Sequence, residues 1–284
     1  MGNTSYNFQS KSVRTADFHT KTTNQIFEQN VKRVVHASML PLGITVREAR
    51  DSELHPHSFP IIIGLDVTGS MGHIPEDFIK DGLPKLISSL TEAGIEDPAI
   101  LFIAVGDHIS DSGPLQVAQF ESGDAELDMW LSRVWIEGNG GGNNGESYPL
   151  VHYIAAKHTV TDHWEKRASK GFIFTIGDER FHETYSSSYM KELTGNSEAS
   201  GFSAAEILAQ AKEKWNVFHI QPGMEKDNSR SQWTSVLGEN NVWVDSYRDI
   251  PKRIAETIIP HVKQHNPEVI KTTPNTGEDN GILL

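Results

Sequence analysis

Oxygen-bearing side chains follow a short apolar run in the first quarter of the chain. Residues 60–65 read Pro-Ile-Ile-Ile-Gly-Leu, and Asp66, Thr68 and Ser70 come directly after them. Carboxylate and hydroxyl oxygens are the atoms that hard divalent cations such as Mg²⁺ prefer. This spacing predicts part of a cation site. The alternative for the same residues is a helix N-terminus, at which Asp or Ser accepts backbone N–H bonds.

A glycine-rich loop is the second stretch that could contribute oxygen. Residues 138–147 read Gly-Asn-Gly-Gly-Gly-Asn-Asn-Gly-Glu-Ser. Asn144 or Asn143 would offer an amide oxygen to a cation, although Asn is also a common turn residue. Glu146 suits a ligand that acts through water, and it also suits the first turn of the helix that we expect after it, the role that we favour.

The third stretch follows another apolar run. Residues 171–176 are followed by Gly177, Asp178 and Glu179. If Asp66 and Asp178 lie close together, their negative charges repel each other, and a bound cation removes that conflict. Mg²⁺ takes six oxygen ligands at ~2.0–2.1 Å and usually keeps some waters, so the site would leave room for an outside ligand.

The elements that must position these loops alternate along the chain. Apolar runs predict buried strands, and amphipathic stretches predict helices between them. This order predicts an α/β fold, a doubly wound and mostly parallel central sheet with helices on both faces, in the Rossmann-like manner. Parallel strands end at the same edge, so the loops can converge there. The expected strands are 60–65, 99–105, 171–176, 217–220 and 242–244, with an antiparallel edge strand at 115–120, and the expected helices are 75–93, 124–135, 148–157, 204–215, 232–237 and 250–265.

Three segments are expected along the chain. Residues 59–265 form one domain, residues 1–58 are an N-terminal extension, and residues 266–284 are a mobile tail. Within the extension, residues 1–20 are expected to be a polar arm, disordered or wrapped on a partner. Residues 22–36 could form a short helix, and residues 42–50 could form a strand.

Composition excludes several classes of partner. The 284 residues carry a net charge of −13, which disfavours nucleic acid and anionic membrane surfaces. The chain has no cysteine, so it has no thiolate metal site and no disulfide. Its first residues lack the apolar core of a secretory signal. We therefore expect a cytoplasmic protein.

The three loops together resemble a known site. Asp66-Val-Thr-Gly-Ser70 is similar to the Asp-x-Ser-x-Ser start of the metal-ion-dependent adhesion site (MIDAS) of von Willebrand factor type A (VWA) domains. The glycine loop with Glu146 resembles the second loop, which reads Gly-Gly-Asp-x-Pro-Glu in many bacterial relatives. Asp178 stands where the family places its last acidic residue. Residues 103–120 are similar to the family's second and third strands.

This resemblance implies a function without bond chemistry. It implies a VWA-like domain, of the intracellular bacterial or phage type, that binds Mg²⁺, Mn²⁺ or Ca²⁺ through Asp66, Thr68, Ser70, Asn144 and Asp178. An acidic side chain of a partner protein would complete the coordination of the metal. Such relatives work beside AAA+ ATPases or in multiprotein assemblies, including virions, so a partner of this kind is implied; the sequence itself identifies none.

The chain departs from the family pattern at three positions. Thr68 replaces the first Ser and keeps the hydroxyl, Asn144 replaces the Thr of the glycine loop, and Glu179 replaces a Gly after Asp178. Asn143, Glu146 and Glu179 are alternative ligands or act through water.

Two other functions fit the same residues less well. A structural subunit could keep the fold and lose the metal. The motif at Asp66 also resembles the nucleophile motif of haloacid-dehalogenase phosphotransferases, in which Asp66 would be phosphorylated with Mg²⁺ as clamp. That family has a second Asp where this chain has Thr68, and the glycine loop has no role in it. Asp107, which follows the strand 99–105, and the scattered histidines are expected to be structural.

Overall fold

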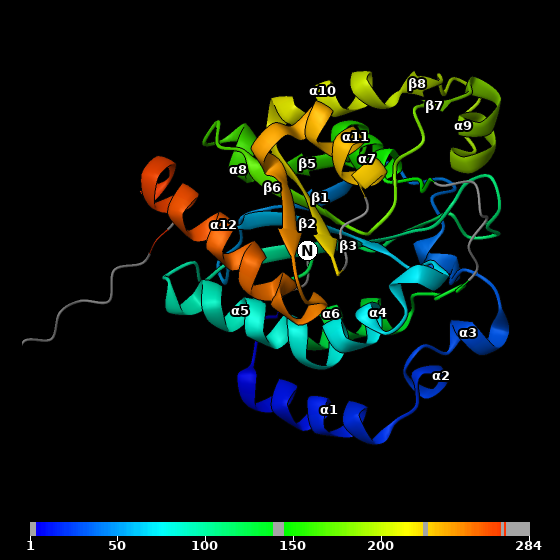
Figure 1. Cartoon of the computed structure of the whole chain (residues 1–284). Coiled ribbons are helices and arrows are strands. Elements are labelled where there is room, and N and C mark those ends of the chain that lie inside the picture. Colours follow the sequence, from blue (N-terminus) through cyan, green and yellow to red (C-terminus); the bar gives the residue numbers. More distant parts are fainter. Residues whose placement is uncertain (1–3, 139–144, 224–226, 268–269, 271–284) are drawn as a thin grey trace, which may run out of the picture.

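A six-stranded sheet forms the centre of the molecule (Figure 1). The computed structural model describes residues 4–138, 145–223, 227–267 and 270. The strands of the sheet lie in the order β10-β9-β6-β2-β3-β4. Their bounds are β2 Phe59–Asp66, β3 Pro98–Val105, β4 Leu115–Val117, β6 Gly171–Ile176, β9 Trp215–Pro222 and β10 Asn241–Val244.

The pairing confirms the predicted class of fold. Each neighbouring pair from β10 to β3 is parallel, whereas β4 runs antiparallel to β3 at the edge. Two small two-stranded sheets lie outside it, β1 (Arg47–Ala49) with β5 (Thr159–Thr161), and β7 (Thr184–Tyr185) with β8 (Phe202–Ser203). Because β2 pairs with both β3 and β6, the loops after these three strands meet at one edge.

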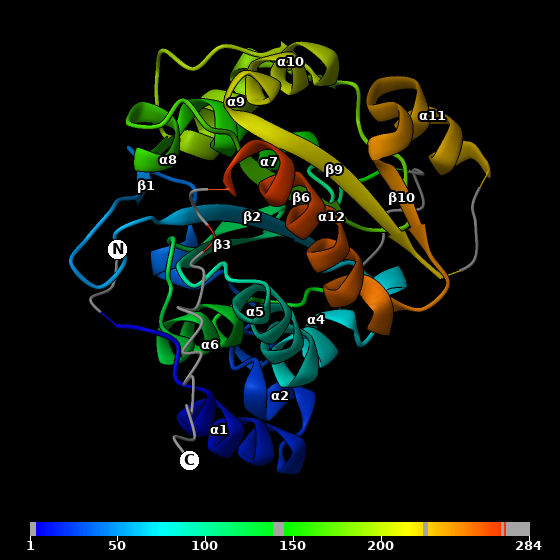
Figure 2. The same cartoon turned by 90° about the vertical axis from the view of Figure 1, so that its left-hand side faces the viewer.

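Helices cover both faces of the sheet (Figure 2). α5 packs against α12 on one face, and α7 packs against α10 on the other. The helices are α1 Phe8–Thr20, α2 Thr23–Ile26, α3 Gln29–Lys32, α4 Ile74–Asp77, α5 Leu83–Glu92, α6 Asp124–Ser132, α7 Pro149–Lys157, α8 Asp162–Glu165, α9 Ser187–Thr194, α10 Ala204–Lys214, α11 Asp227–Leu237 and α12 Ile250–His265. A π-helical turn spans Phe78–Gly82, and short 3₁₀ helices span Ala37–Met39, Gly69–Met71, Gly238–Asn240 and Tyr247–Asp249.

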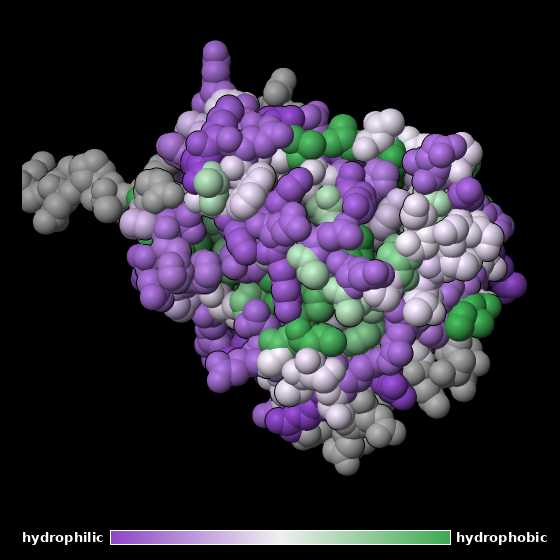
Figure 3. All heavy atoms as spheres, turned by 90° about the horizontal axis from the view of Figure 1, so that it is seen from above, coloured by the Kyte–Doolittle hydropathy of each residue, from purple (hydrophilic) through white to green (hydrophobic). Residues whose placement is uncertain are grey.

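The core runs through the middle strands. Every residue of β2 and β3 is buried, as expected for strands covered on both faces. Gly64 lets α7 approach β2 closely, because a Cβ atom there would lie 2.8 Å from Cγ2 of Val151. In the described part of the chain, no helix combines the length and the apolar character that a bilayer span requires. The face at the top of Figure 1 is mostly hydrophilic, and hydrophobic side chains reach its surface in limited areas (Figure 3).

The predicted helix 75–93 consists of three segments. α4 and α5 are joined by the π-helical turn Phe78–Gly82, which ends two residues before Pro84. Proline has no N–H to donate to the carbonyl four residues earlier, which favours a widened turn at this place. That carbonyl, of Lys80, accepts a hydrogen bond from the hydroxyl of Thr15 at 3.3 Å.

The N-terminal extension packs against the domain. Residues 8–20 form α1, which packs on this same chain, so the prediction of a polar arm, disordered or wrapped on a partner, was wrong for this part. The buried ammonium group of Lys11 lies 2.5 Å from Asp128 Oδ1 and donates to the carbonyl of Ile79 at 3.0 Å. The packing of α1 involves an ion pair between two residues that are more than a hundred positions apart in the sequence. A local sequence pattern does not reveal such a contact.

The rest of the extension differs from the predictions in detail. The stretch 22–36 forms two short helices, α2 and α3, with Arg33 in the left-handed region at φ 52° where the second ends. Of the predicted strand 42–50, only residues 47–49 form a strand, β1. It pairs with β5 outside the central sheet. Most of the expected tail, 268–269 and 271–284, lies outside the described residues.

Candidate metal centre

Asp66 ends β2 and is the centre of a cluster of oxygen atoms. Its side chain is fully buried. Oδ1 accepts hydrogen bonds from the N–H of Thr68 at 2.8 Å and from its hydroxyl at 2.6 Å. Oδ2 accepts a hydrogen bond from the hydroxyl of Tyr148 at 2.6 Å. Both oxygens of the carboxylate are therefore held in place by their neighbours.

The hydroxyl groups of Thr68 and Ser70 lie between Asp66 and Asp178. Thr68 Oγ1 lies 3.4 Å from Ser70 Oγ, and Ser70 donates to Asp178 Oδ1 at 2.9 Å. Thr68 stands at the start of a 3₁₀ helix but makes no capping bond with its side chain. The structure thus brings together Asp66, Thr68, Ser70 and Asp178, four of the five predicted ligands, and it does not use Thr68 as a helix cap.

Tyr148 is a member of this cluster that the sequence analysis missed. Its ring is fully buried, and its hydroxyl reaches Asp66 from the start of α7. Gly177 leaves the space for it, because a Cβ atom at position 177 would lie 1.9 Å from the hydroxyl oxygen. The residue reads as an ordinary core aromatic in sequence, so no pattern pointed to its contact with Asp66.

Glu146 is a further buried acidic residue, close enough to Asp66 for their charges to interact. Only 5% of the residue is exposed, and its Oε2 has no hydrogen-bond partner within the described residues. Burial raises the pKa of Glu146, and the negative charges of Asp66 and Asp107 raise it further. Since α7 begins at Pro149, the predicted role of Glu146 in the first turn of that helix was wrong. Its backbone instead bonds to Arg180 and His182 at 2.8 and 3.1 Å.

The ionisation of Asp66 shows the same conflict. Burial raises the pKa of Asp66 above its ordinary value, and the negative charge of Asp178 also raises it. The hydrogen bonds from Thr68 and Tyr148 lower this pKa, but they do not cancel the effect of burial. Several carboxyl groups gathered away from water are unfavourable as anions unless a positive charge lies among them. The orphaned oxygen of Glu146 and the oxygen-only donor set therefore fit a hard divalent cation.

Asn143, Asn144 and Glu179 are the remaining residues that the sequence predicts to be ligands or to act through water. Asn143 and Asn144 lie outside the described residues. Glu179 is half-buried, and its charge is among those that raise the pKa of Glu146. Its backbone carbonyl accepts a hydrogen bond from the indole of Trp233 at 3.1 Å, which fixes the loop after β6.

Known proteins resemble this chain only in part. No protein-family model matches the chain, and no curated protein is significantly similar to it. Among solved structures, the pilus adhesin SpaC from Lactobacillus rhamnosus GG matches with a TM-score of 0.47 and 12% identity, over 72% of this chain and 30% of that one. Proximal thread matrix protein 1 from the mussel byssus, with a zinc-occupied MIDAS motif, matches with a TM-score of 0.44 and 9% identity, over 78% and 47%.

A von Willebrand factor type A protein from Catenulispora acidiphila also matches, with a TM-score of 0.37 and 15% identity, over 70% of this chain and 42% of that one. The chain thus spans about a third to a half of the length of these proteins. Similarity at this level says nothing about function, which has to be argued from this chain's own residues.

Proposed function

We propose that the chain is a VWA-like module that recognises another protein through a divalent cation. Asp66, Thr68, Ser70 and Asp178 would hold the cation at the carboxyl edge of the sheet, with Asn144 as a further ligand and Mg²⁺ as the first candidate. Asn143, Glu146 and Glu179 would act through water or as alternative ligands. The observation that carries the proposal is a cluster of oxygen atoms: Thr68 donates to Asp66, Ser70 donates to Asp178, and the two hydroxyl oxygens lie 3.4 Å apart, beside the unpartnered oxygen of Glu146.

The charge of the protein supports an acidic group as the partner's contact. With a net charge of −13, the chain repels a carboxylate in general. A cation with an open coordination position reverses the sign of the field at one place, so a carboxylate from the partner would bind there and nowhere else nearby. The partner would be a component of a multiprotein assembly or an AAA+ ATPase, as the resemblance of the motifs implies.

The proposal includes no chemical step. At position 68 a Thr hydroxyl donates to Asp66, where the phosphotransferase scheme needs a carboxyl group. A structural subunit without metal stays open as an alternative, since it would keep the same fold.

Capture of partners under two metal conditions tests the function. The immobilised full chain is exposed to an extract of its source cells in Mg²⁺ and, separately, in EDTA. We expect at least one protein that binds in Mg²⁺, is released by EDTA, and is not retained by Asp66→Asn. The isosteric Asn keeps the volume and loses the charge that holds the cation.

A control separates loss of metal from loss of structure. Glu239→Gln changes an exposed carboxyl group far along the chain and should retain the same partner. A partner that binds the wild-type chain equally in Mg²⁺ and in EDTA, and that also binds Asp66→Asn, would favour the structural subunit. Turnover of an aryl phosphate that disappears in Asp66→Asn would favour the phosphotransferase and contradict the proposal.

A further inference from the structure

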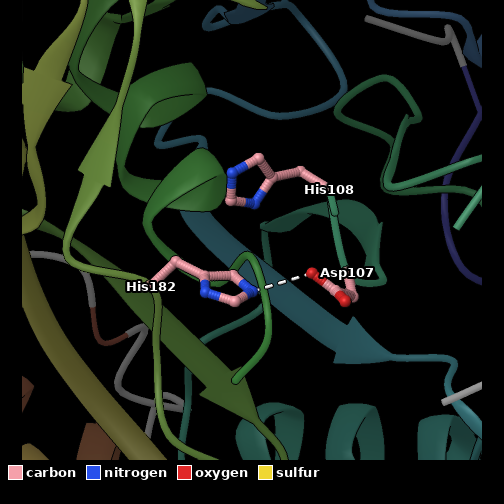
Figure 4. A group of neighbouring side chains, drawn as sticks. All are labelled: Asp107, His108 and His182. Carbon is pink, nitrogen blue, oxygen red and sulfur yellow. Dashed lines mark hydrogen bonds and ion pairs between the residues drawn. The ribbon is translucent and has the colours of Figure 1, made fainter. Parts of the chain in front are cut away.

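A second group of ligand-type side chains lies beside the Asp66 site. Asp107 follows β3 and is fully buried, and His182 belongs to the loop after β6. His182 Nε2 lies 2.7 Å from Asp107 Oδ1. His108 adds a second imidazole next to both (Figure 4). The sequence alone indicates structural roles for these residues, because Asp107 stands in a loop at a strand end and the histidines are scattered along the chain.

The donor atoms of these three residues converge. One ligand atom from each of Asp107, His108 and His182 lies within 4.8 Å of the others. In Figure 4 the ring of His182 points its Nε2 at Asp107, and the ring of His108 lies above the pair. The two rings meet edge to face, with centroids 4.7 Å apart. Two loops that are separated by more than seventy residues thus supply one carboxylate and two imidazoles.

Neighbouring groups fix the orientation of these side chains. Ser147 Oγ lies 2.9 Å from His108 Nδ1 and accepts a hydrogen bond from the N–H of His108 at 2.8 Å. Asp107 accepts hydrogen bonds from the N–H of Ile109 at 3.0 Å and from the hydroxyl of Ser110 at 2.7 Å. Outer partners of this kind orient metal ligands in proteins and tune their affinity.

Aromatic side chains shield the cluster from water. The rings of Tyr185 and Tyr189 lie 4.6 and 4.9 Å from that of His108. The side chain of His182 is 14% exposed, so the cluster keeps an opening to solvent. A shielded group of donors with one open side is the usual setting of a metal site with three protein ligands.

We propose that Asp107, His108 and His182 form a second cation site, which takes a divalent transition metal of the Zn²⁺ type. Imidazole nitrogen suits Zn²⁺ and its neighbours in the first transition row, whereas the oxygen-only cluster at Asp66 suits Mg²⁺. The two sites therefore differ in the chemistry of their cations. This inference does not depend on the proposed function of the Asp66 site.

Small movements would complete the coordination. Ligand atoms around a tetrahedral Zn²⁺ lie about 3.3 Å apart, given bonds of about 2.0–2.1 Å. The Asp107–His182 pair, at 2.7 Å, has to open by a few tenths of an ångström. The widest pair, within 4.8 Å, has to close by at most about 1.5 Å, which side-chain rotation of the half-buried His108 can supply.

A metal at this place would cross-link two loops of the same sheet edge. One loop follows β3 and the other follows β6, and the consecutive residues Ser147 and Tyr148 connect this cluster to Asp66. Ser147 contacts His108, while Tyr148 contacts Asp66. The bound ion would thus hold the loops around the first site in a single arrangement.

Titration with Zn²⁺ tests the proposal. The full chain without an affinity tag is saturated with Mg²⁺, and Zn²⁺ is then added in a calorimeter. We expect one equivalent of Zn²⁺ to bind, and His182→Gln to weaken that binding at least ~10-fold. Co²⁺ in place of Zn²⁺ should give visible absorption bands of a nitrogen-ligated ion, which His182→Gln should remove.

Two control variants make the result specific. Asp66→Asn should keep the Zn²⁺ equivalent, and His57→Gln, at an exposed histidine, should keep it as well. Equal Zn²⁺ binding by the wild type and His182→Gln would overturn the proposal, as would no binding by the wild type. Loss of Zn²⁺ in Asp66→Asn with retention in His182→Gln would also overturn it, because the ion would then occupy the first site. A melting curve of His182→Gln with and without Mg²⁺ checks that the variant folds.

Discussion

At the scale of single residues, Gly177 and Tyr148 show how tightly the candidate site is built. The hydroxyl of Tyr148 donates to Asp66, and Gly177 is the residue that gives this hydroxyl its space. A cation site needs its carboxylate in a fixed orientation, and here that orientation depends on a contact between α7 and the loop after β6. The smallest possible addition at position 177 therefore tests the arrangement.

Gly177→Ala should destabilise the protein by about 1–3 kcal/mol, the usual cost of overpacking a buried contact. Its Cβ atom would lie 1.9 Å from the hydroxyl oxygen of Tyr148, so that ring has to move away from Asp66. Urea denaturation followed by circular dichroism measures the change in the free energy of unfolding. A change below about 0.5 kcal/mol would mean that Tyr148 does not occupy this position.

His163 ties stability to pH at a place far from the metal ligands. It is fully buried against the ring of Phe59, 5.2 Å away, and neither ring nitrogen has a partner within the described residues. Burial lowers the pKa of His163 to about 4, and the nearby charge of Arg167 lowers it too. In the unfolded chain the pKa is about 6.5, so the unfolded chain binds more protons between these values. The contribution to stability is complete above pH 6.5 and is lost as the pH falls toward 4.

His163→Leu should therefore reduce the loss of stability in acid. For one such group the loss between pH 8 and pH 5 is about 2 kcal/mol. An apolar residue of similar size should leave the stability at pH 8 nearly unchanged, because no hydrogen bond is removed. Urea midpoints of the variant and the wild type at both pH values give the comparison. An equal loss in the two proteins would exclude this role for His163.

At the scale of elements, α1 compensates for the widened turn before Pro84. Lys11 donates to the carbonyl of Ile79, and Thr15 donates to that of Lys80. Lys11 is also paired with Asp128 of α6, and both side chains are buried. The N-terminal helix thus supplies hydrogen bonds that the helix 74–92 cannot make by itself.

Lys11→Met should lower the free energy of unfolding by about 2–3 kcal/mol. Removal of one partner leaves the buried charge of Asp128 with Arg14 alone, and uncompensated buried charges are costly. Lys21→Met is a matched control, because Lys21 forms an exposed pair with Asp17 that contributes little. If the two variants lose the same amount of stability, α1 does not depend on Lys11.

Elements with a clear local hydrophobic pattern could be predicted from the sequence. The buried strands β2, β3 and β6 and the helix α12 were predicted nearly to the residue, because each is a compact apolar run or a clear amphipathic stripe. α1 and the pair β1–β5 were missed or misplaced. Their positions depend on contacts with distant parts of the chain, as Lys11 with Asp128 shows, and no local pattern encodes such contacts.

At the scale of the whole molecule, parallel strand order explains how much of the site could be predicted. Asp66 and Asp178 end neighbouring strands, so the fold class alone implies that they meet. The same rule applies to Asp107 after β3, which was set aside as structural although it lies at the same edge. The contributions of Tyr148 and His182 depend on side-chain directions, which a sequence does not contain.

The charge of the molecule bears on the cation binding that we propose. A bound cation would stabilise the buried carboxyl groups at one sheet edge of a protein whose net charge is −13. Binding to the folded state alone raises the free energy of unfolding by about 2.7 kcal/mol when the free ion is at a hundred times its dissociation constant. In a chain of this size that corresponds to a rise in Tm of about 5 °C.

Thermal melting of the wild type and Asp66→Asn, first in EDTA and then in saturating Mg²⁺, tests this claim most directly. We predict that Mg²⁺ raises the Tm of the wild type by about 5 °C and leaves that of Asp66→Asn unchanged. A wild-type Tm that neither Mg²⁺ nor Mn²⁺ moves would contradict the account, and so would an equal rise in the variant.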